Sequence, residues 1–155
     1  MKAIIPLFLA GCVLAQEYDL LLKGGHVIDG KNKISAVHDV AAWGENSHIY
    51  PISRAWTTST LHAGQFTAAC GLHIYRGDAL PGEYYGNAFT CEPVHNLVHR
   101  EVLERDGASF RSRRAADERQ SEFLASRDPW FRPTMIRTGP DGALYVSDMY
   151  RLVIE

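Results

Sequence analysis

Histidines are the residues of this 155-residue chain whose spacing could support metal-assisted chemistry. Zinc hydrolases use pairs such as HxH or HExxH, because these spacings place two imidazoles on one ion. The chain contains no HxH pair, and residues 96–98, between His95 and His99, contain no glutamate. The pattern therefore predicts no histidine-based metal site. The histidines searched are His26, His38, His48, His62, His73, His95 and His99.

Polar side chains also gather in three short segments, CEPVHNLVHR (91–100), SRDPWFRP (126–133) and SDMYR (147–151). Prolines stiffen the second segment, and aromatic or arginine side chains on a stiff loop make binding anchors. Alternatively, this loop places Trp130 and Phe131 in the core. Asp148 ends a predicted strand and could instead bind turn amides, and the arginines could form structural ion pairs with Asp128 or Asp148. Both interpretations stay open at this point.

The three cysteines, Cys12, Cys70 and Cys91, form no CxxC or CxxCH motif. This excludes a zinc ribbon, a thioredoxin-type dithiol and covalently attached c-type haem within this chain. Cys70 and Cys91 could form a disulfide in an oxidising compartment. They could equally be two buried thiols, and spacing alone does not decide between these alternatives.

The N-terminus has the order of a secretory signal peptide, with a Lys2 charge followed by an apolar stretch over residues 3–15. We expect a signal peptide over residues 1–15 with cleavage before Gln16. Leu9–Cys12 also resembles a bacterial lipobox, which would make Cys12 the lipidated first residue. Either way the product is exported, as a periplasmic or secreted protein, and in the second case it is anchored to a membrane by lipid.

Composition indicates one globular domain, with 46% hydrophobic and 22% charged residues. Sixteen Lys and Arg against 18 Asp and Glu give a net charge of -2, which argues against a nucleic-acid partner. Beyond residue 15 no apolar run approaches the roughly 20 residues that span a bilayer.

Residues 16–46 have a pattern of their own. Leu20–Leu22, Gly24-Gly25, His26–Ile28 and Asp29-Gly30 predict two short strands around a glycine kink and a turn, with a further strand at 37–42. The segment YDLLLKGGHVIDGKNKISAVHDVAA resembles the start of amidohydrolase-type metal-dependent hydrolases. It carries none of that family's metal ligands, and the barrel of that family does not fit in the remaining chain.

From residue 47 onward, strand candidates recur every 8–12 residues between Gly, Pro and Asp turns, which predicts an all-β fold. Asp106-Gly107 and Asp141-Gly142 mark hairpins, because glycine accepts a positive φ. Residues 115–123 are expected to form a helical turn or an exposed loop, and the alternating charges of 111–119 to be solvated. The strand candidates are 71–75, 87–91, 97–103, 109–113, 134–137, 143–147 and, as one further strand, 150–154.

Residues 66–78, 81–100, 123–133 and 137–155 of this second part carry long motifs. In these motifs the chain resembles the membrane-bound dehydrogenase family of planctomycete-type bacteria, a β-propeller family. That family is similar to soluble glucose/sorbosone dehydrogenases that use pyrroloquinoline quinone. The resemblance implies a propeller that oxidises a sugar or other alcohol, with pyrroloquinoline quinone and calcium as possible cofactors. Longer members carry further blades and a haem c domain.

The chain departs from that family in lacking CxxCH and in having strands for about one and a half to two four-stranded blades, whereas a propeller needs at least ~4 blades. We therefore expect residues 47–155 to form a partial propeller, joined between residues 42 and 47 to the preceding β segment, with an incomplete reaction centre. Two alternatives remain: an amidohydrolase-type hydrolase and a non-catalytic propeller interaction module.

If the resemblance holds, a quinone-dependent dehydrogenase needs a base for the substrate hydroxyl and a cation that polarises the quinone. His95 is the preferred base, because it follows Pro93 where a strand should end and a loop can present it; a structural histidine is the alternative. The other expected catalytic residues are Arg132 and Asp148. The expected cofactor-binding residues are Asn96, His99, Arg127, Asp128 and Arg151. Glu92 and Asp128 offer oxygen atoms to calcium, but no ligand spacing supports such a site.

Overall fold

A computed structural model describes residues 20–29, 34–42, 48–53, 64–107 and 109–153 of the chain. The expected signal peptide, the lipidation candidate Cys12 and the expected junction after residue 42 lie outside the described residues, so these expectations stay predictions. Among the described residues, no helix is long and apolar enough to cross a membrane.

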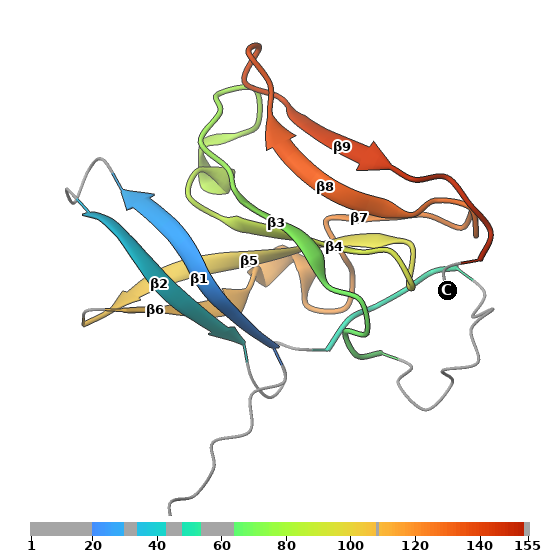
Figure 1. Cartoon of the computed structure of the whole chain (residues 1–155), viewed down its shortest axis with the longest axis horizontal. Coiled ribbons are helices and arrows are strands. Elements are labelled where there is room, and N and C mark those ends of the chain that lie inside the picture. The colour runs from blue at the N-terminus through green and yellow to red at the C-terminus, as the bar shows by residue number, and fades with distance from the viewer. Residues whose placement is uncertain (1–19, 30–33, 43–47, 54–63, 108, 154–155) are drawn as a thin grey trace, which may run out of the picture.

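Strands joined by turns make up the described part of the chain, which confirms the all-β prediction (Figure 1). Strands β1 to β6 lie in one sheet in the order β1-β2-β6-β5-β4-β3, β7 pairs with β5, and β8 pairs with β9 in a second sheet. Two short 3₁₀ turns, η3 (Gly82–Tyr84) and η4 (Ala116–Glu118), lie between strands. The strand bounds are β1 (Leu20–Asp29), β2 (Ile34–Ala42), β3 (Cys70–Ile74), β4 (Ala88–Glu92), β5 (Leu97–Asp106), β6 (Ser109–Arg114), β7 (Leu124–Ala125), β8 (Pro133–Thr138) and β9 (Leu144–Asp148).

The N-terminal hairpin β1–β2 extends the main sheet. The two strands predicted around Gly24-Gly25 form a single strand, β1, whose register against β2 shifts between Leu22 and Gly25. Strand β2 then pairs in parallel with β6, at Val40 opposite Phe110 and Ala41 opposite Arg111. The segment that the sequence sets apart therefore joins the same sheet as β3 to β7.

Strands β3, β4, β5 and β6 follow one another as an antiparallel meander. The hairpin between β5 and β6 is placed as predicted, because Asp106 pairs with Ser109 and Gly107 has a φ of +62°. Every residue of β4 and the first five residues of β5 are buried. Strand β4 and the first half of β5 are therefore covered on both faces and form the centre of the molecule.

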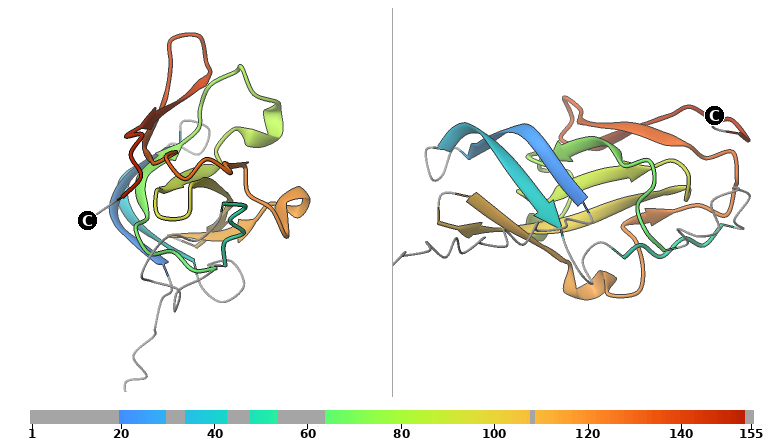
Figure 2. Two further views of the ribbon diagram at one scale, coloured as in Figure 1. Left: turned by 90° about the vertical axis from the view of Figure 1, so that its right-hand side faces the viewer. Right: turned by 60° about the horizontal axis from the view of Figure 1, so that its bottom comes forward.

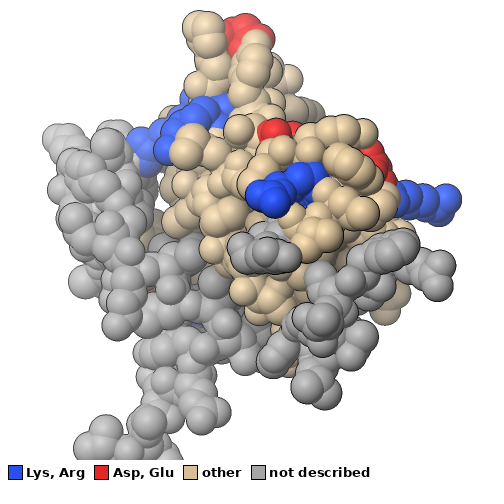
Figure 3. Space-filling view, turned by 45° about the vertical axis from the view of Figure 1, so that its right-hand side comes forward, with Lys and Arg blue, Asp and Glu red and all other residues tan. Residues whose placement is uncertain are grey.

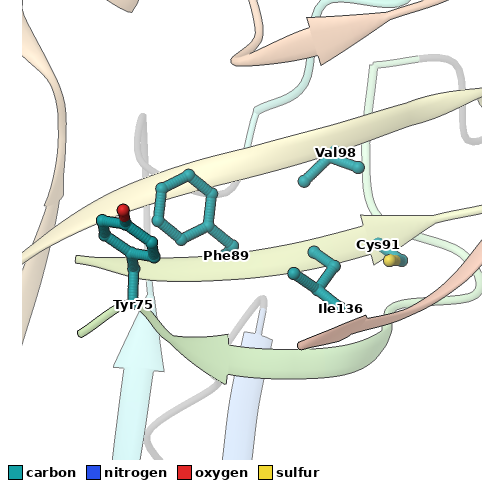
Figure 4. Packing of buried hydrophobic residues seen from close by; sticks show 5 residues of the cluster. All are labelled: Tyr75, Phe89, Cys91, Val98 and Ile136. Carbon is teal, nitrogen blue, oxygen red and sulfur yellow. The ribbon is translucent and has the colours of Figure 1, made fainter. Parts of the chain in front are cut away.

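The second sheet packs on the first, since β8 contacts both β3 and β4 (Figures 1 and 2). Between them lies an apolar core in which Ile136 of β8 meets Phe89 and Cys91 of β4, Val98 of β5 and Tyr75 (Figure 4). The phenol of Tyr75 donates a 2.6 Å hydrogen bond to the Gly142 carbonyl in the β8–β9 turn. This bond ties the second sheet to the loop that follows β3.

The strand predicted at residues 150–154 is wrong over its described part, 150–153, which contains no strand. Tyr150 has a φ of +45°, which is not an extended conformation. Its N–H donates to Asp148, while the Arg132 side chain binds the carbonyls of Arg151 and Leu152. Side chains thus form the hydrogen bonds to these backbone N–H and C=O groups that a neighbouring strand would otherwise form.

The close approach of two turns gives a testable prediction. A Cβ on Gly77 would lie 2.0 Å from the Gly142 carbonyl oxygen, whereas a Cβ on Gly82 meets nothing within 4 Å. We expect Gly77→Ala to lower the free energy of unfolding by about 2 kcal/mol, since two backbones must separate. Gly82→Ala, the matched control, should stay within about 0.5 kcal/mol. Urea unfolding followed by tryptophan fluorescence measures both; equal stabilities would contradict this packing.

Candidate functional site

The turn between β4 and β5, residues 93–96, is the meeting point of most of the polar residues singled out in the sequence. Asn96 has a φ of +57°, a left-handed conformation that asparagine tolerates better than most residues. Its side-chain amide donates to the Phe131 carbonyl at 2.6 Å and the Pro129 carbonyl at 3.4 Å. The Asn96 carbonyl accepts the N–H of Ser126 at 2.9 Å. Asn96 therefore fastens the 126–132 loop to this turn.

Arg132 is buried, with 3% of its surface exposed, and its guanidinium binds backbone carbonyls. It donates to Pro93 at 2.7 Å and Val94 at 3.1 Å in the turn. It also donates to Arg151 at 3.1 Å and Leu152 at 2.6 Å in the segment after β9. Burial lowers the pKa of Arg132, but the planar donors still match the converging carbonyls. Arg132 thus joins two segments that are distant in the sequence.

Asp148 occupies the end of β9 and binds amides, the structural alternative considered for it. Its Oδ1 accepts the N–H of Arg132 and the N–H of Tyr150, both at 2.8 Å. Asp148 therefore positions Arg132 and sustains the unusual backbone conformation of Tyr150. The Arg151 side chain is exposed and contributes its carbonyl to the same junction.

The 126–132 loop is stiffened by Asp128, whose Oδ1 accepts the N–H of Trp130 at 2.9 Å. Trp130 remains 44% exposed, and its ring lies 5.7 Å from the ring of Tyr150. The interpretation that the loop places Trp130 and Phe131 in the core is therefore wrong for Trp130, while Phe131 is half-buried and Arg132 is the deeply buried residue of this loop. Arg127 is exposed at the surface.

His95 lies at the tip of this turn with only 6% of its surface exposed. One ring nitrogen, Nε2, is buried without a hydrogen-bond partner, and the ring has a hydrogen bond to the backbone of Gln65. Burial lowers the pKa of His95, and Arg132 lowers it further, against opposing effects of Glu92 and Gln65. The imidazole is therefore neutral at pH 7. With its other nitrogen bonded to backbone, Nε2 is the nitrogen left for chemistry.

Glu92, at the end of β4, takes the role of a loop anchor. Its carboxylate accepts the N–H of Thr67 at 3.0 Å, Ala68 at 2.9 Å and Val94 at 3.2 Å. This fully buried residue thus holds the segment before β3 against the β4–β5 turn. Because Glu92 and Asp128 both bind amides, they do not fit the calcium ligands suggested for them. Within the described ranges, no group of three or more His, Cys, Asp or Glu residues could hold a metal ion.

His99 belongs to a different cluster, which the sequence did not reveal. Its Nδ1 lies 2.7 Å from Glu122 and its Nε2 2.8 Å from Glu101, with all three side chains at most 7% exposed. Burial alone would lower the pKa of His99, but its hydrogen bonds to Glu101 and Glu122 and their charges outweigh that effect and raise it. His99 is thus an imidazolium held between carboxylates, and both of its ring nitrogens are already engaged.

The carboxylate of Glu122 also binds Tyr50, in the described segment 48–53, and Arg114 at the end of β6. Its Oε1 accepts the N–H of Tyr50 at 2.8 Å and lies 3.1 Å from Arg114. On the other side of β5, Arg100 pairs with Asp117 at 2.6 Å and Glu118 at 3.0 Å. Arg114 and Glu118 are largely buried, so the prediction that the 111–119 charges are all solvated is wrong. The exposed pair of Asp106 and Arg111 does fit that prediction.

An open hollow of about 590 Å³ lies beside Glu122 and is lined by Tyr50, Ile52, Gln120 and neighbouring residues. None of the expected catalytic or cofactor-binding residues lines it. The structure therefore gathers His95, Asn96, Asp128, Arg132, Asp148 and the Arg151 backbone at the β4–β5 turn, and it separates His99 from them.

These features define an all-β protein in which one hairpin turn organises the surrounding loops. A family model described as a domain of unknown function (DUF7133) matches residues 14–155, and the chain belongs to that family. The match includes both the N-terminal segment and the part that follows it. No curated protein and no solved structure matches the chain.

The ion pair of His99 and Glu122 gives a pH-dependent prediction. The raised pKa of His99 means that its stabilisation is complete below its ordinary value of 6.5 and is lost as pH rises through the folded-state pKa. Burial alone would raise the pKa of Glu122, but His99 and Arg114 outweigh burial and lower that pKa. The stabilisation from Glu122 is therefore complete above pH 4.5 and is lost as pH falls through its folded-state pKa. Stability from this pair should therefore be flat between pH 4.5 and 6.5.

We expect Glu122→Gln to lower the free energy of unfolding by roughly 3 kcal/mol near pH 6, because a buried imidazolium loses a partner. The loss should shrink as pH falls below 4.5 through the lowered pKa of Glu122, and as pH rises above 6.5 through the raised pKa of His99. The control is Glu104→Gln, which breaks the exposed pair with Arg113 and should cost about 0.5 kcal/mol. Urea unfolding across pH measures both; a pH-independent loss in Glu122→Gln would show that the pair is not ionised.

Proposed function

We propose that this chain contributes one blade and the inner half of the next blade to a β-propeller. The support is the order of its strands: β3 to β6 form a consecutive four-stranded meander, and the hairpin β8–β9 stacks on β3 and β4. Propeller blades are four-stranded sheets packed around an axis, which is the relation these two sheets would have. The exported location expected from residues 1–15 belongs to the same proposal.

We further infer that the function is that of an exported quinoprotein-like dehydrogenase that oxidises a sugar or other alcohol. The observation that carries this inference is His95. A neutral imidazole with an unpartnered Nε2, oriented through its other nitrogen by backbone, has the properties of a general base for a substrate hydroxyl. Since Nε2 is buried, a substrate reaches it only when the loops at this turn part.

Arg132 and Asp148 support this site as positioning residues. The guanidinium of Arg132 binds the carbonyls of Pro93 and Val94, which immediately precede His95. Asp148 in turn fixes the backbone of Arg132. Because four hydrogen bonds from the Arg132 guanidinium and two to Asp148 Oδ1 go to backbone groups, we assign these residues to holding His95 in place and not to polarising a quinone.

The described residues do not fit pyrroloquinoline quinone with calcium, because the carboxylates at this turn already bind amides. The acceptor for the substrate hydride must therefore be held by groups outside the described residues. We accordingly propose that the residues described here supply the proton acceptor and only part of the reaction centre.

The test is an assay of alcohol-dependent dye reduction with added pyrroloquinoline quinone and calcium, across a panel of aldoses and simple alcohols. We expect His95→Gln to lower kcat/KM by about 10²- to 10⁴-fold, as for loss of a general base. The acid limb of the pH profile should fall below pH 6.5, because the pKa of His95 is lowered from that value. His73→Gln is the matched control, since His73 is 2.7 Å from Thr138 in a purely structural contact.

Equal rates in His95→Gln and the wild type would overturn His95 as the base. The assay uses the complete propeller to which this chain contributes, because the chain is proposed to supply only part of the reaction centre. Absence of turnover in that wild-type propeller over the whole panel would overturn the dehydrogenase proposal. Zinc bound at one or two ions per chain would instead support the amidohydrolase-type alternative.

A second candidate function, a non-catalytic interaction module, is favoured by the outer face of β8–β9. Met135 and Tyr145 are 46% and 56% exposed there. Figure 3 shows one face of the molecule, on which Lys, Arg, Asp and Glu side chains lie scattered among uncharged ones. Met135→Glu should abolish partner binding under this alternative and leave dye reduction unchanged under the first.

A further inference from the structure

Cys70 and Cys91 are directly opposite each other in the pairing of β3 and β4. Opposed residues of antiparallel strands have Cα atoms about 4.5 to 5.5 Å apart. A disulfide requires Cα atoms roughly 4.4 to 6.8 Å apart. The register therefore brings the two cysteines within the range of a covalent bond without movement of either strand.

The two side chains also lie on the same face of the sheet. Cys91 is fully buried in the apolar core with Phe89, Val98 and Ile136 (Figure 4). Cys70 is partly buried and packs against that same core. Both are thiols in this structure, and the Cys70 Sγ lies 4.0 Å from the Pro133 carbonyl oxygen. The two sulfur atoms thus share one environment between β3, β4 and the start of β8.

We propose that Cys70 and Cys91 form a structural disulfide that fastens the start of β3 to β4 when the protein meets a disulfide oxidant of the glutathione class. The Cys70 thiolate attacks the oxidant's S–S bond, which gives a mixed disulfide and releases one thiol. The Cys91 thiolate then attacks the Cys70 sulfur, forming the protein S–S bond and releasing the second thiol. The protein loses two S–H bonds, and the oxidant takes up two electrons and two protons.

The environment of the pair makes this bond a permanent cross-link and not a rapid switch. Burial raises the pKa of Cys70, and the neighbouring charge of Glu92 raises it further. Burial, together with a smaller electrostatic effect of Cys70, raises the pKa of Cys91 to about 12. Thiolates are the reactive species in exchange, so the folded protein exchanges slowly. The bond should therefore form while the chain folds, before the core closes over Cys91.

The cross-link would reinforce a junction that hydrogen bonds already hold. Glu92, next to Cys91, accepts the amides of Thr67 and Ala68, which lie just before Cys70. Covalent and hydrogen-bonded connections thus join the same two segments. Loss of the disulfide should loosen the amides of Thr67 and Ala68 in particular.

The test refolds the full chain in a glutathione redox buffer, blocks free thiols and digests the protein with trypsin without reduction. Tryptic cleavage after Arg54, Arg76 and Arg100 puts Cys70 in peptide 55–76 and Cys91 in peptide 77–100. We expect these two peptides to be linked. The oxidised protein should melt about 10 °C above the reduced protein, as for a cross-link closing a loop of this length. Reduction should also speed hydrogen exchange at Thr67 and Ala68.

Cys70→Ala provides the control: its melting temperature should not respond to reductant, and peptide 77–100 should carry the thiol-blocking group. Recovery of both peptides unlinked and blocked after oxidative refolding would overturn the proposal. So would linkage of either peptide to peptide 3–23, which contains Cys12.

Discussion

The central hairpin β4–β5 imposes one constraint on the whole molecule: β4 and the first half of β5 are buried on both faces although β5 carries charge. His99, Arg100 and Glu101 follow one another in a strand, so His99 and Glu101 face one side and Arg100 the other. A buried charge without a partner is strongly destabilising. The 115–122 segment supplies partners to both faces, with Glu122 on one side and Asp117 and Glu118 on the other. Its path is therefore dictated by the charges of β5.

At its turn, the same hairpin organises the surrounding loops through hydrogen bonds between side chains and backbone groups. At the β4–β5 turn, Glu92, Asn96 and Arg132 bind backbone groups of the loops around them. Each loop has irregular backbone that would otherwise leave donors and acceptors without partners on folding. His95 is placed by this framework with one nitrogen unengaged, which is the feature that the proposed chemistry requires.

Local features of the sequence predicted much of the fold. Alternating apolar residues and the Asp-Gly turns located β5–β6 and β8–β9, because glycine at positive φ and two-residue periodicity act within a few positions. Long-range contacts were not predictable in this way. Glu122 and His99 are 23 positions apart, and their ion pair requires the path of a loop that no short pattern encodes. Residues 150–153 failed as a strand for the same reason, since their backbone partners come from Arg132.

The sequence identified the residues of the candidate site, but it predicted the role of each side chain only in part. In the structure, parts of segments 91–100, 126–133 and 147–151 meet at one turn, while His99 of the first segment lies in a different cluster. Which of their side chains serve the backbone depended on burial, as the contrast between Arg132 and Trp130 shows.

The four hydrogen bonds from Arg132 to carbonyl oxygens have a consequence for how the sequences of this family can diverge. Every amino acid presents the same carbonyl, so Pro93, Val94, Arg151 and Leu152 can be exchanged for other residues without removing an acceptor. Only the arginine itself cannot be replaced. Drift among relatives should therefore be wide at the four acceptor positions and narrow at position 132.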